Sequence, residues 1–122
     1  MRLALAAVAM FTMATSVPAA ERLYPLVIDW QEYFRIESQT TVRDGKTLVS
    51  GTVWNTSRWS ATRIQLLIDG VDAGGTLVVQ RVIWLGIDLA AGTRGAFEVP
   101  MPAASGYRVS VFAYDSRRGR WG

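Results

Sequence analysis

Tryptophan is the residue type in this sequence best suited to a functional role, because its large ring can bind a partner. The 122 residues contain five tryptophans but no histidine and no cysteine. The chain therefore has no imidazole for acid–base catalysis, no thiolate nucleophile and no cysteine ligand for zinc. Carboxylates remain, and a glycosidase-like mechanism needs two of them across one cleft. No two of the available carboxylates are expected to share a cleft; they are Asp29, Glu32, Glu37, Asp88, Glu98 and Asp115. We expect a non-catalytic protein without a cofactor.

One acidic, glycine-rich stretch resembles a metal loop in composition. Asp69 and Asp72 are followed by Gly74 and Gly75. The stretch does not follow the EF-hand pattern, and two carboxylates fall short of the about six to eight oxygens that Ca²⁺ takes. We expect a polar hairpin turn and no metal site.

The aromatic residues are the candidates for binding. If the valines beside it face the core, strand alternation turns Trp54 towards solvent. The same alternation along the last strand turns Phe112 and Tyr114 outward. Trp59, in a polar loop, and Trp84, near a strand end, complete the candidate partner-binding set. Such a set suits a protein partner or a stacked sugar, unless the leading segment or the tail covers the rings.

The elements that position these rings are predicted β-strands. They are short blocks in which apolar and polar residues alternate, bounded by turn residues. Asp44-Gly45 is the sharpest turn signal, because both residues tolerate positive φ in a two-residue hairpin. The spacing predicts an all-β fold, an immunoglobulin-like antiparallel β-sandwich of about seven strands, with a small closed barrel as its rival. The predicted strands are residues 34–42, 46–55, 63–68, 76–85, 95–99 and 107–115, with a seventh at 24–30.

The first twenty residues read as a secretory signal peptide. Arg2 precedes a run of twelve residues, 3–14, that is apolar except for Thr12, and small residues follow, with cleavage after Ala19 or Ala20. The run is shorter than the ~20 residues that span a bilayer, which disfavours a retained anchor. We expect a periplasmic or secreted protein with no membrane span after cleavage.

The rest of the chain reads as one domain. We predict a signal peptide at 1–20, an N-terminal leader or first strand at 21–32, the β-sandwich at 33–115 and a basic tail at 116–122. Removal of residues 1–20 leaves 12 basic and 10 acidic side chains, a net charge of +2. That small excess on an exported domain predicts no nucleic-acid partner.

Two residues of the second predicted strand have structural interpretations. Gly51, inside a strand, predicts a close backbone approach or a bulge. Asn55, at the strand end, is expected to hydrogen-bond nearby backbone and stabilise the following loop. Asn55-Thr56-Ser57 also matches a glycosylation sequon.

The stretch Leu48-Val49-Ser50-Gly51-Thr52-Val53-Trp54-Asn55-Thr56-Ser57 resembles the v-x-G-x-V-x-N-x-S strand of FxLYD-type bacterial domains. The similarity continues through residues 64–69, the Leu89-Ala90-Ala91-Gly92 turn and Phe97. At the family's aromatic-x-Leu-Tyr-Asp signature this chain has Leu66-Leu67-Ile68-Asp69. The resemblance implies a small exported immunoglobulin-like sandwich without catalytic residues. We therefore expect a domain that binds another envelope or secreted protein; the alternative is a small carbohydrate-binding module that uses exposed tryptophans.

Overall fold

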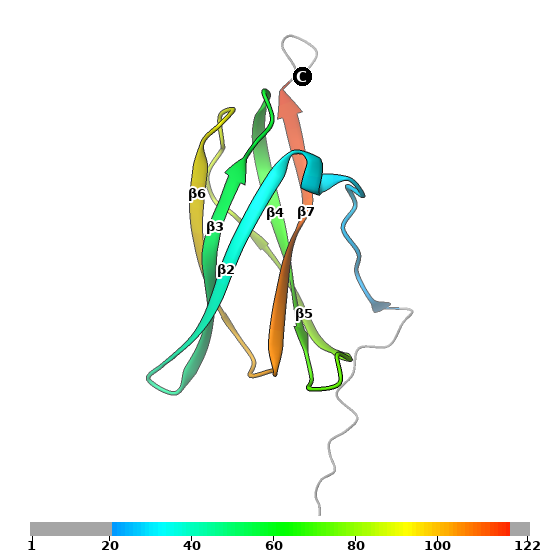
Figure 1. Cartoon of the computed structure of the whole chain (residues 1–122), viewed down its shortest axis with the longest axis vertical. Coiled ribbons are helices and arrows are strands. Elements are labelled where there is room, and N and C mark those ends of the chain that lie inside the picture. Colours follow the sequence, from blue (N-terminus) through cyan, green and yellow to red (C-terminus); the bar gives the residue numbers. More distant parts are fainter. Residues whose placement is uncertain (1–20, 118–122) are drawn as a thin grey trace, which may run out of the picture.

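The computed structural model describes residues 21–117, most of which form antiparallel strands (Figure 1). The predicted signal peptide and the end of the basic tail, with Trp121, lie outside these residues. Within residues 21–117, a 3-10 helix precedes six strands: η3 (Trp30–Glu32), β2 (Phe34–Arg43), β3 (Lys46–Asn55), β4 (Ser60–Val71), β5 (Leu77–Trp84), β6 (Arg94–Met101) and β7 (Gly106–Arg117). The possible seventh strand at 24–30 does not form: residues 21–29 are an irregular leader, and Trp30 begins η3. No helix within 21–117 has the length and apolar character to span a membrane.

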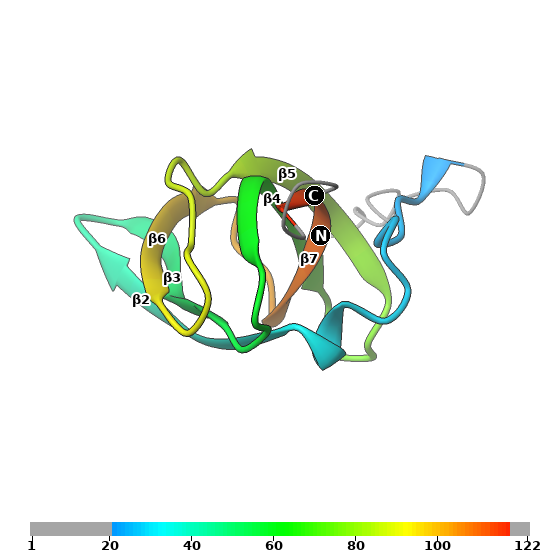
Figure 2. The ribbon, with the colours of Figure 1, turned by 90° about the horizontal axis from the view of Figure 1, so that it is seen from above.

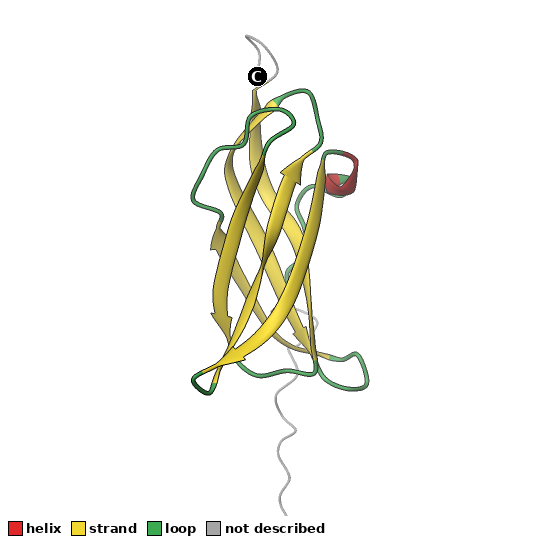
Figure 3. Cartoon of the chain, turned by 60° about the vertical axis from the view of Figure 1, so that its left-hand side comes forward, coloured by secondary structure: helices red, strands yellow, loops and turns green. Residues whose placement is uncertain are grey.

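The strands form two three-stranded sheets, ordered β2-β3-β6 and β5-β4-β7. The connections β3–β4, β5–β6 and β6–β7 each pass from one sheet to the other, a Greek-key pattern typical of immunoglobulin-like sandwiches. Seen from above, the two sheets stand side by side (Figure 2), and the strands run along the long axis of the molecule (Figure 3). The predicted all-β antiparallel sandwich is confirmed.

Alternation along each strand builds the core between the sheets. Every second residue of β6 is buried, and the solvent side is polar or small. The two sheets contribute aliphatic side chains to one cluster, in which the buried residues include Val49, Val53, Ile64, Leu66, Ile68, Phe97, Val99, Met101, Val109 and Val111. These side chains hold the domain together in the absence of any disulfide.

The first hairpin has the predicted turn. Asp44 and Gly45 both have positive φ, at 54° and 76°, and Arg43 lies opposite Lys46. Two successive positive φ angles are those of a type I′ turn, which matches the twist of the flanking strands.

Gly51 marks a close approach, as predicted. A β-carbon on Gly51 would lie 2.0 Å from the carbonyl oxygen of Glu37 and 2.8 Å from the Cα of Ser38. Those are backbone atoms of β2, which no rotamer change can displace. Glycine is therefore required for β2 and β3 to pair at this point.

A bulge between β4 and β7 interrupts the alternation. Thr62 lies opposite Asp115, but Gln65 lies opposite Ala113, so two residues of β4 face one residue of β7. Arg63, one of the two, adopts a positive φ of 52°. The next pair joins Leu66 to Val111, which leaves Phe112 as an extra residue on β7.

The bulge overturns the predicted orientation of Tyr114. Its ring packs against the core and meets Phe34 edge-on, with 4.8 Å between the ring centroids. Val111 also faces the core. Residues three apart can share a face only if the alternation slips by one, which the extra residue Phe112 provides. The expectation that Tyr114 faces solvent was therefore wrong.

Candidate binding surfaces

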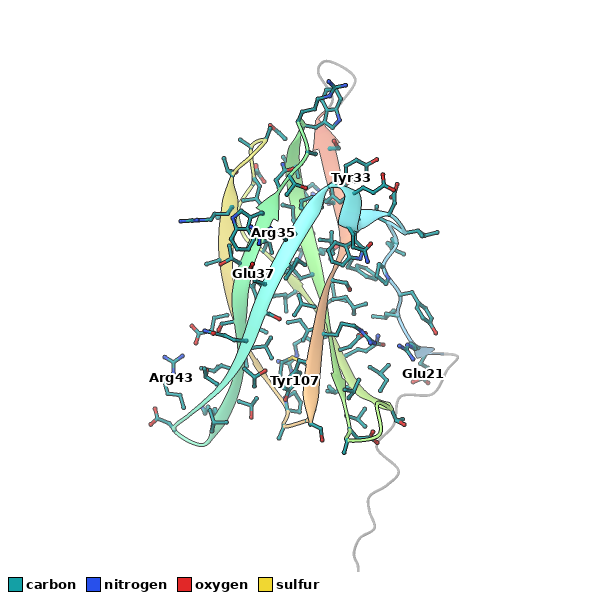
Figure 4. All side chains as sticks on the ribbon, viewed as in Figure 1. Glu21, Tyr33, Arg35, Glu37, Arg43 and Tyr107 are labelled. Atoms are coloured by element: carbon teal, nitrogen blue, oxygen red, sulfur yellow. The ribbon has the colours of Figure 1, made fainter. Side chains whose placement is uncertain are left out.

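Trp54 lies on the outer face of the β2-β3-β6 sheet, as alternation predicted. It is flanked across the strands by Arg35 of β2 and Arg94 of β6. The guanidinium carbon of Arg35 stands 3.8 Å from the centroid of the Trp54 ring. Glu37, two residues along β2, forms an ion pair with the same guanidinium, with 2.5 Å between its Oε2 and Nη1 of Arg35 (Figure 4). We call the row Arg35, Trp54 and Arg94 the Trp54 face.

The stacked arginine changes what Trp54 presents. One face of the indole is covered by a planar cation, and the residue is half-buried although it lies outside the core. The ring is held on a central strand, and stacking against Arg35 restrains both side chains. A partner would thus meet a pre-ordered surface made of aromatic and cationic groups.

The same outer face carries further charges along its length. Arg43 pairs with Glu98 on β6, and Lys46 lies opposite Arg43 at the end of the hairpin. The side chains of Arg43 and Glu98 are about half exposed, at 62% and 49%, so the pair contributes little to stability. These charges mainly shape the electrostatic potential of this outer face.

Trp84 lies on the opposite side of the sandwich. It ends β5 and is 57% exposed; the guanidinium of Arg63 stands 5.8 Å from its ring centroid. Arg63 in turn forms an ion pair with Asp115, with 3.1 Å between Nε and Oδ2. Because Ile83 packs against the core, its neighbour Trp84 projects from the outer face of the β5-β4-β7 sheet.

The predicted aromatic set does not form one patch. Trp54 and Trp84 project from different sheets, in opposite directions, and Tyr114 packs against the core. Trp59 lies half-buried in the loop between β3 and β4, where Arg58 stands 5.0 Å from its ring centroid. Phe112 is half-buried beside the leader, since its carbonyl accepts a hydrogen bond from the Leu26 amide at 2.9 Å.

The leader covers part of the outer face of the β5-β4-β7 sheet. The side-chain amide of Gln80 donates to the carbonyl of Leu23 and accepts from its N–H, both at 2.9 Å. Gln80 also donates to Asp69 at 2.9 Å, and Arg108 donates to the other oxygen of Asp69 at 3.1 Å. Gln80, Asp69 and Arg108 lie opposite one another on three strands. This polar row anchors the leader.

Sequence reasoning missed this row, although a signal was present. Leu66-Leu67-Ile68 is continuously apolar, a pattern typical of a strand that is buried on both faces. Leu67 is 1% exposed yet lies outside the inter-sheet core, and Asp69 is 6% exposed. The unbroken run therefore indicated that something covers the outside of β4.

Asn55 has the structural role that its position predicted. Its side chain is 1% exposed and donates to the carbonyls of Trp59 and Leu89 at 2.8 and 3.0 Å. Its oxygen accepts from both the N–H and the hydroxyl of Ser57. Both amide hydrogens are engaged, so the folded chain does not present this sequon for glycosylation.

The acidic turn behaves as a turn. One oxygen of Asp72 accepts hydrogen bonds from the N–H groups of Gly74 and Thr76, both at 2.9 Å. Asp69 points elsewhere, into the row with Gln80 and Arg108. No cluster of three or more metal-ligating side chains occurs among the residues that the structure describes.

Comparison with protein-family models finds no match for this chain. Searches of curated proteins and of solved structures likewise find no match.

Proposed function

We propose that this chain is an exported, non-catalytic β-sandwich that binds another protein of the envelope or the secreted space through the Trp54 face. The observation that carries the proposal is the stack of Arg35 on Trp54, at 3.8 Å. Tryptophan and arginine are the residues most enriched among the energetic centres of protein interfaces. A stack that is already ordered loses little side-chain entropy when a partner docks.

Export is supported by the sequence of residues 1–20, with its basic start, apolar run and small residues. The resemblance to FxLYD-type domains agrees with an exported sandwich without catalytic residues. Three of the six scattered carboxylates are held by surface arginines: Glu37 by Arg35, Glu98 by Arg43 and Asp115 by Arg63. These ion pairs engage the three carboxylates with surface arginines, which supports a non-catalytic function.

The alternative is a carbohydrate-binding module, which needs rings that stack on one sugar chain. Trp54 and Trp84 project from opposite sheets and so offer no common platform. Arg35 also covers one face of Trp54. Both observations favour a protein partner over a glycan.

The decisive experiment compares two tryptophan variants. The tagged mature chain, W54A and the matched control W84A are cross-linked in envelope extract, and captured proteins are quantified by mass spectrometry. We expect a protein that the wild type and W84A capture equally and that W54A loses by about tenfold or more. Equal capture by W54A would refute the Trp54 face as the binding site.

A second measurement addresses glycans. Tryptophan fluorescence of the mature chain is titrated with cell-wall oligosaccharides, and the proposal expects no saturable change. A saturable change that W84A abolishes would support the carbohydrate-binding alternative instead.

A further inference from the structure

Part of the outer edge of β2 lacks the features that usually protect a sheet edge. Among residues 21–117, β2 pairs only with β3, and it is the end strand of its sheet. Residues 38–42 are all exposed and read Ser-Gln-Thr-Thr-Val, with no charge and no proline. Sheet edges are usually blunted by charges, proline or bulges, because a bare edge pairs with other strands.

The backbone groups at this edge can be assigned from the ladder. The N–H of Asn55 donates to Thr93 and its carbonyl accepts from Gly92, so both groups point away from β2. Its pair with Phe34 is therefore not hydrogen-bonded, and antiparallel pairs alternate. The register of β2 with β3 is unbroken, so every second pair counted from Phe34–Asn55 is likewise not hydrogen-bonded. Ser38, Thr40 and Val42 thus direct their N–H and C=O groups to the free edge.

This end of β2 is also accessible. The hairpin bearing Arg43 extends away from the base of β7, which bears Tyr107 (Figure 4), and the view from above shows the same separation (Figure 2). Val42, near its tip, is 72% exposed. A second strand can therefore approach along residues 38–42.

The charges at the two ends of this segment are self-complementary. If a second copy pairs antiparallel about a two-fold axis at Thr40, residues whose numbers are equally far from 40 lie opposite one another. Glu37 then faces Arg43 of the second copy, and Arg43 faces its Glu37. An axis at Gln39 would instead place Arg35 opposite Arg43 of the second copy, two like charges. The charges favour the axis at Thr40.

We infer that the chain forms a homodimer in which two β2 strands pair antiparallel about Thr40 and join two sheets into one of six strands. Ser38, Thr40 and Val42 form hydrogen-bonded pairs with Val42, Thr40 and Ser38 of the second copy. Each such pair exchanges two bonds, which gives about six across the interface. Glu37 and Arg43 occupy the intervening pairs, in which side chains approach more closely.

Charge reversal tests both the surface and the register. Sedimentation of the mature chain over a range of concentrations is compared with that of E37R and R43E. In each single variant the facing pairs carry like charges, so we expect the dissociation constant to rise about tenfold or more. An equimolar mixture of E37R and R43E restores opposite charges at both pairs. It should form a 1:1 heterodimer about as tight as the wild type, which native mass spectrometry distinguishes by mass.

A backbone variant tests strand pairing separately. T40P removes an N–H that points to the free edge, so it leaves the bonds to β3 intact, whereas T40A keeps that N–H. We expect T40P to weaken the dimer at least about tenfold and T40A to leave it unchanged, with folding checked by circular dichroism. A wild-type chain that stays monomeric at millimolar concentration would overturn the inference. So would a dimer that E37R and R43E leave intact, or single variants whose mixture does not associate.

Discussion

The carbonyl oxygen of Glu37 occupies the space where a β-carbon of residue 51 would stand, 2.0 Å from that position. Gly51 therefore allows β2 to lie against β3, and the free edge of β2 depends on that contact. The Trp54 face and the proposed dimer edge both belong to this pair of strands. Perturbing Gly51 is thus the most direct test of how the sheet is built.

Replacement of Gly51 by alanine should strongly destabilise the domain. The new methyl group would meet the β2 backbone, which must shift, and such overpacking costs about 1–3 kcal/mol. We expect the upper end of this range, because the obstructing atoms belong to the backbone. Gly106→Ala is the control, since its β-carbon meets Val71 at an ordinary 3.7 Å. Urea unfolding should give a much lower midpoint for G51A and a nearly unchanged one for G106A. Equal midpoints would contradict the close approach.

Replacement of Asn55 by alanine should also destabilise the fold. The Ser57 N–H would lose its partner, close to a side chain that is 1% exposed. The carbonyls of Trp59 and Leu89 would each lose one hydrogen bond but keep a second one, from the Ser57 hydroxyl and the Ala61 N–H. One unsatisfied group and two lost bonds cost about 2–3 kcal/mol together. The neighbouring Thr56→Ala, at an exposed position, should change the unfolding free energy by under about 0.5 kcal/mol. Thermal and urea unfolding of the two variants measure the difference.

Tyr114 and Trp84 should differ sharply when truncated, although both are aromatic residues of the same sheet. Tyr114→Ala removes a ring that packs on Phe34 and the core, at a cost of about 3 kcal/mol. Trp84→Ala removes a ring that is 57% exposed and should cost under about 1 kcal/mol. A stability loss for Y114A no larger than for W84A would argue against the slipped alternation at the bulge.

Replacement of Gln80 by alanine should release the start of the leader. The Leu23 N–H donates to Gln80 at 2.9 Å, and loss of one such bond speeds exchange of that amide with solvent about fivefold to tenfold. Hydrogen exchange of residues 21–26, followed by mass spectrometry, measures the effect. Gln39→Ala, on the other sheet, serves as the control. Unchanged exchange in Q80A would mean that other contacts hold the leader.

Much of the strand layout was predictable because it depends on local patterns. Alternation and turn residues gave the six strands to within a few residues, and Asp44-Gly45 specified its turn through two positive φ angles. Gly51 and Asn55 were also interpreted correctly. Their roles follow from what a missing side chain or a short amide does at a strand interior or end.

The orientation of the aromatic rings was only partly predictable. Trp54 faces outward as expected, because β3 pairs without a register shift. Tyr114 turns inward, since one extra residue at Phe112 reverses the alternation beyond it. A bulge arises from the match between two strands far apart in sequence, so a single strand pattern does not reveal it.

By itself, the sequence determined the chemistry that is available: tryptophan and arginine side chains on short strands, with neither imidazole nor thiol. Only the tertiary structure decided which of them meet. Arg35 and Trp54 are 19 positions apart, and Asp69 is 39 from Arg108. Strand register brings each pair together. Register depends on burial and pairing across the whole sandwich, which residue types and local spacing do not encode.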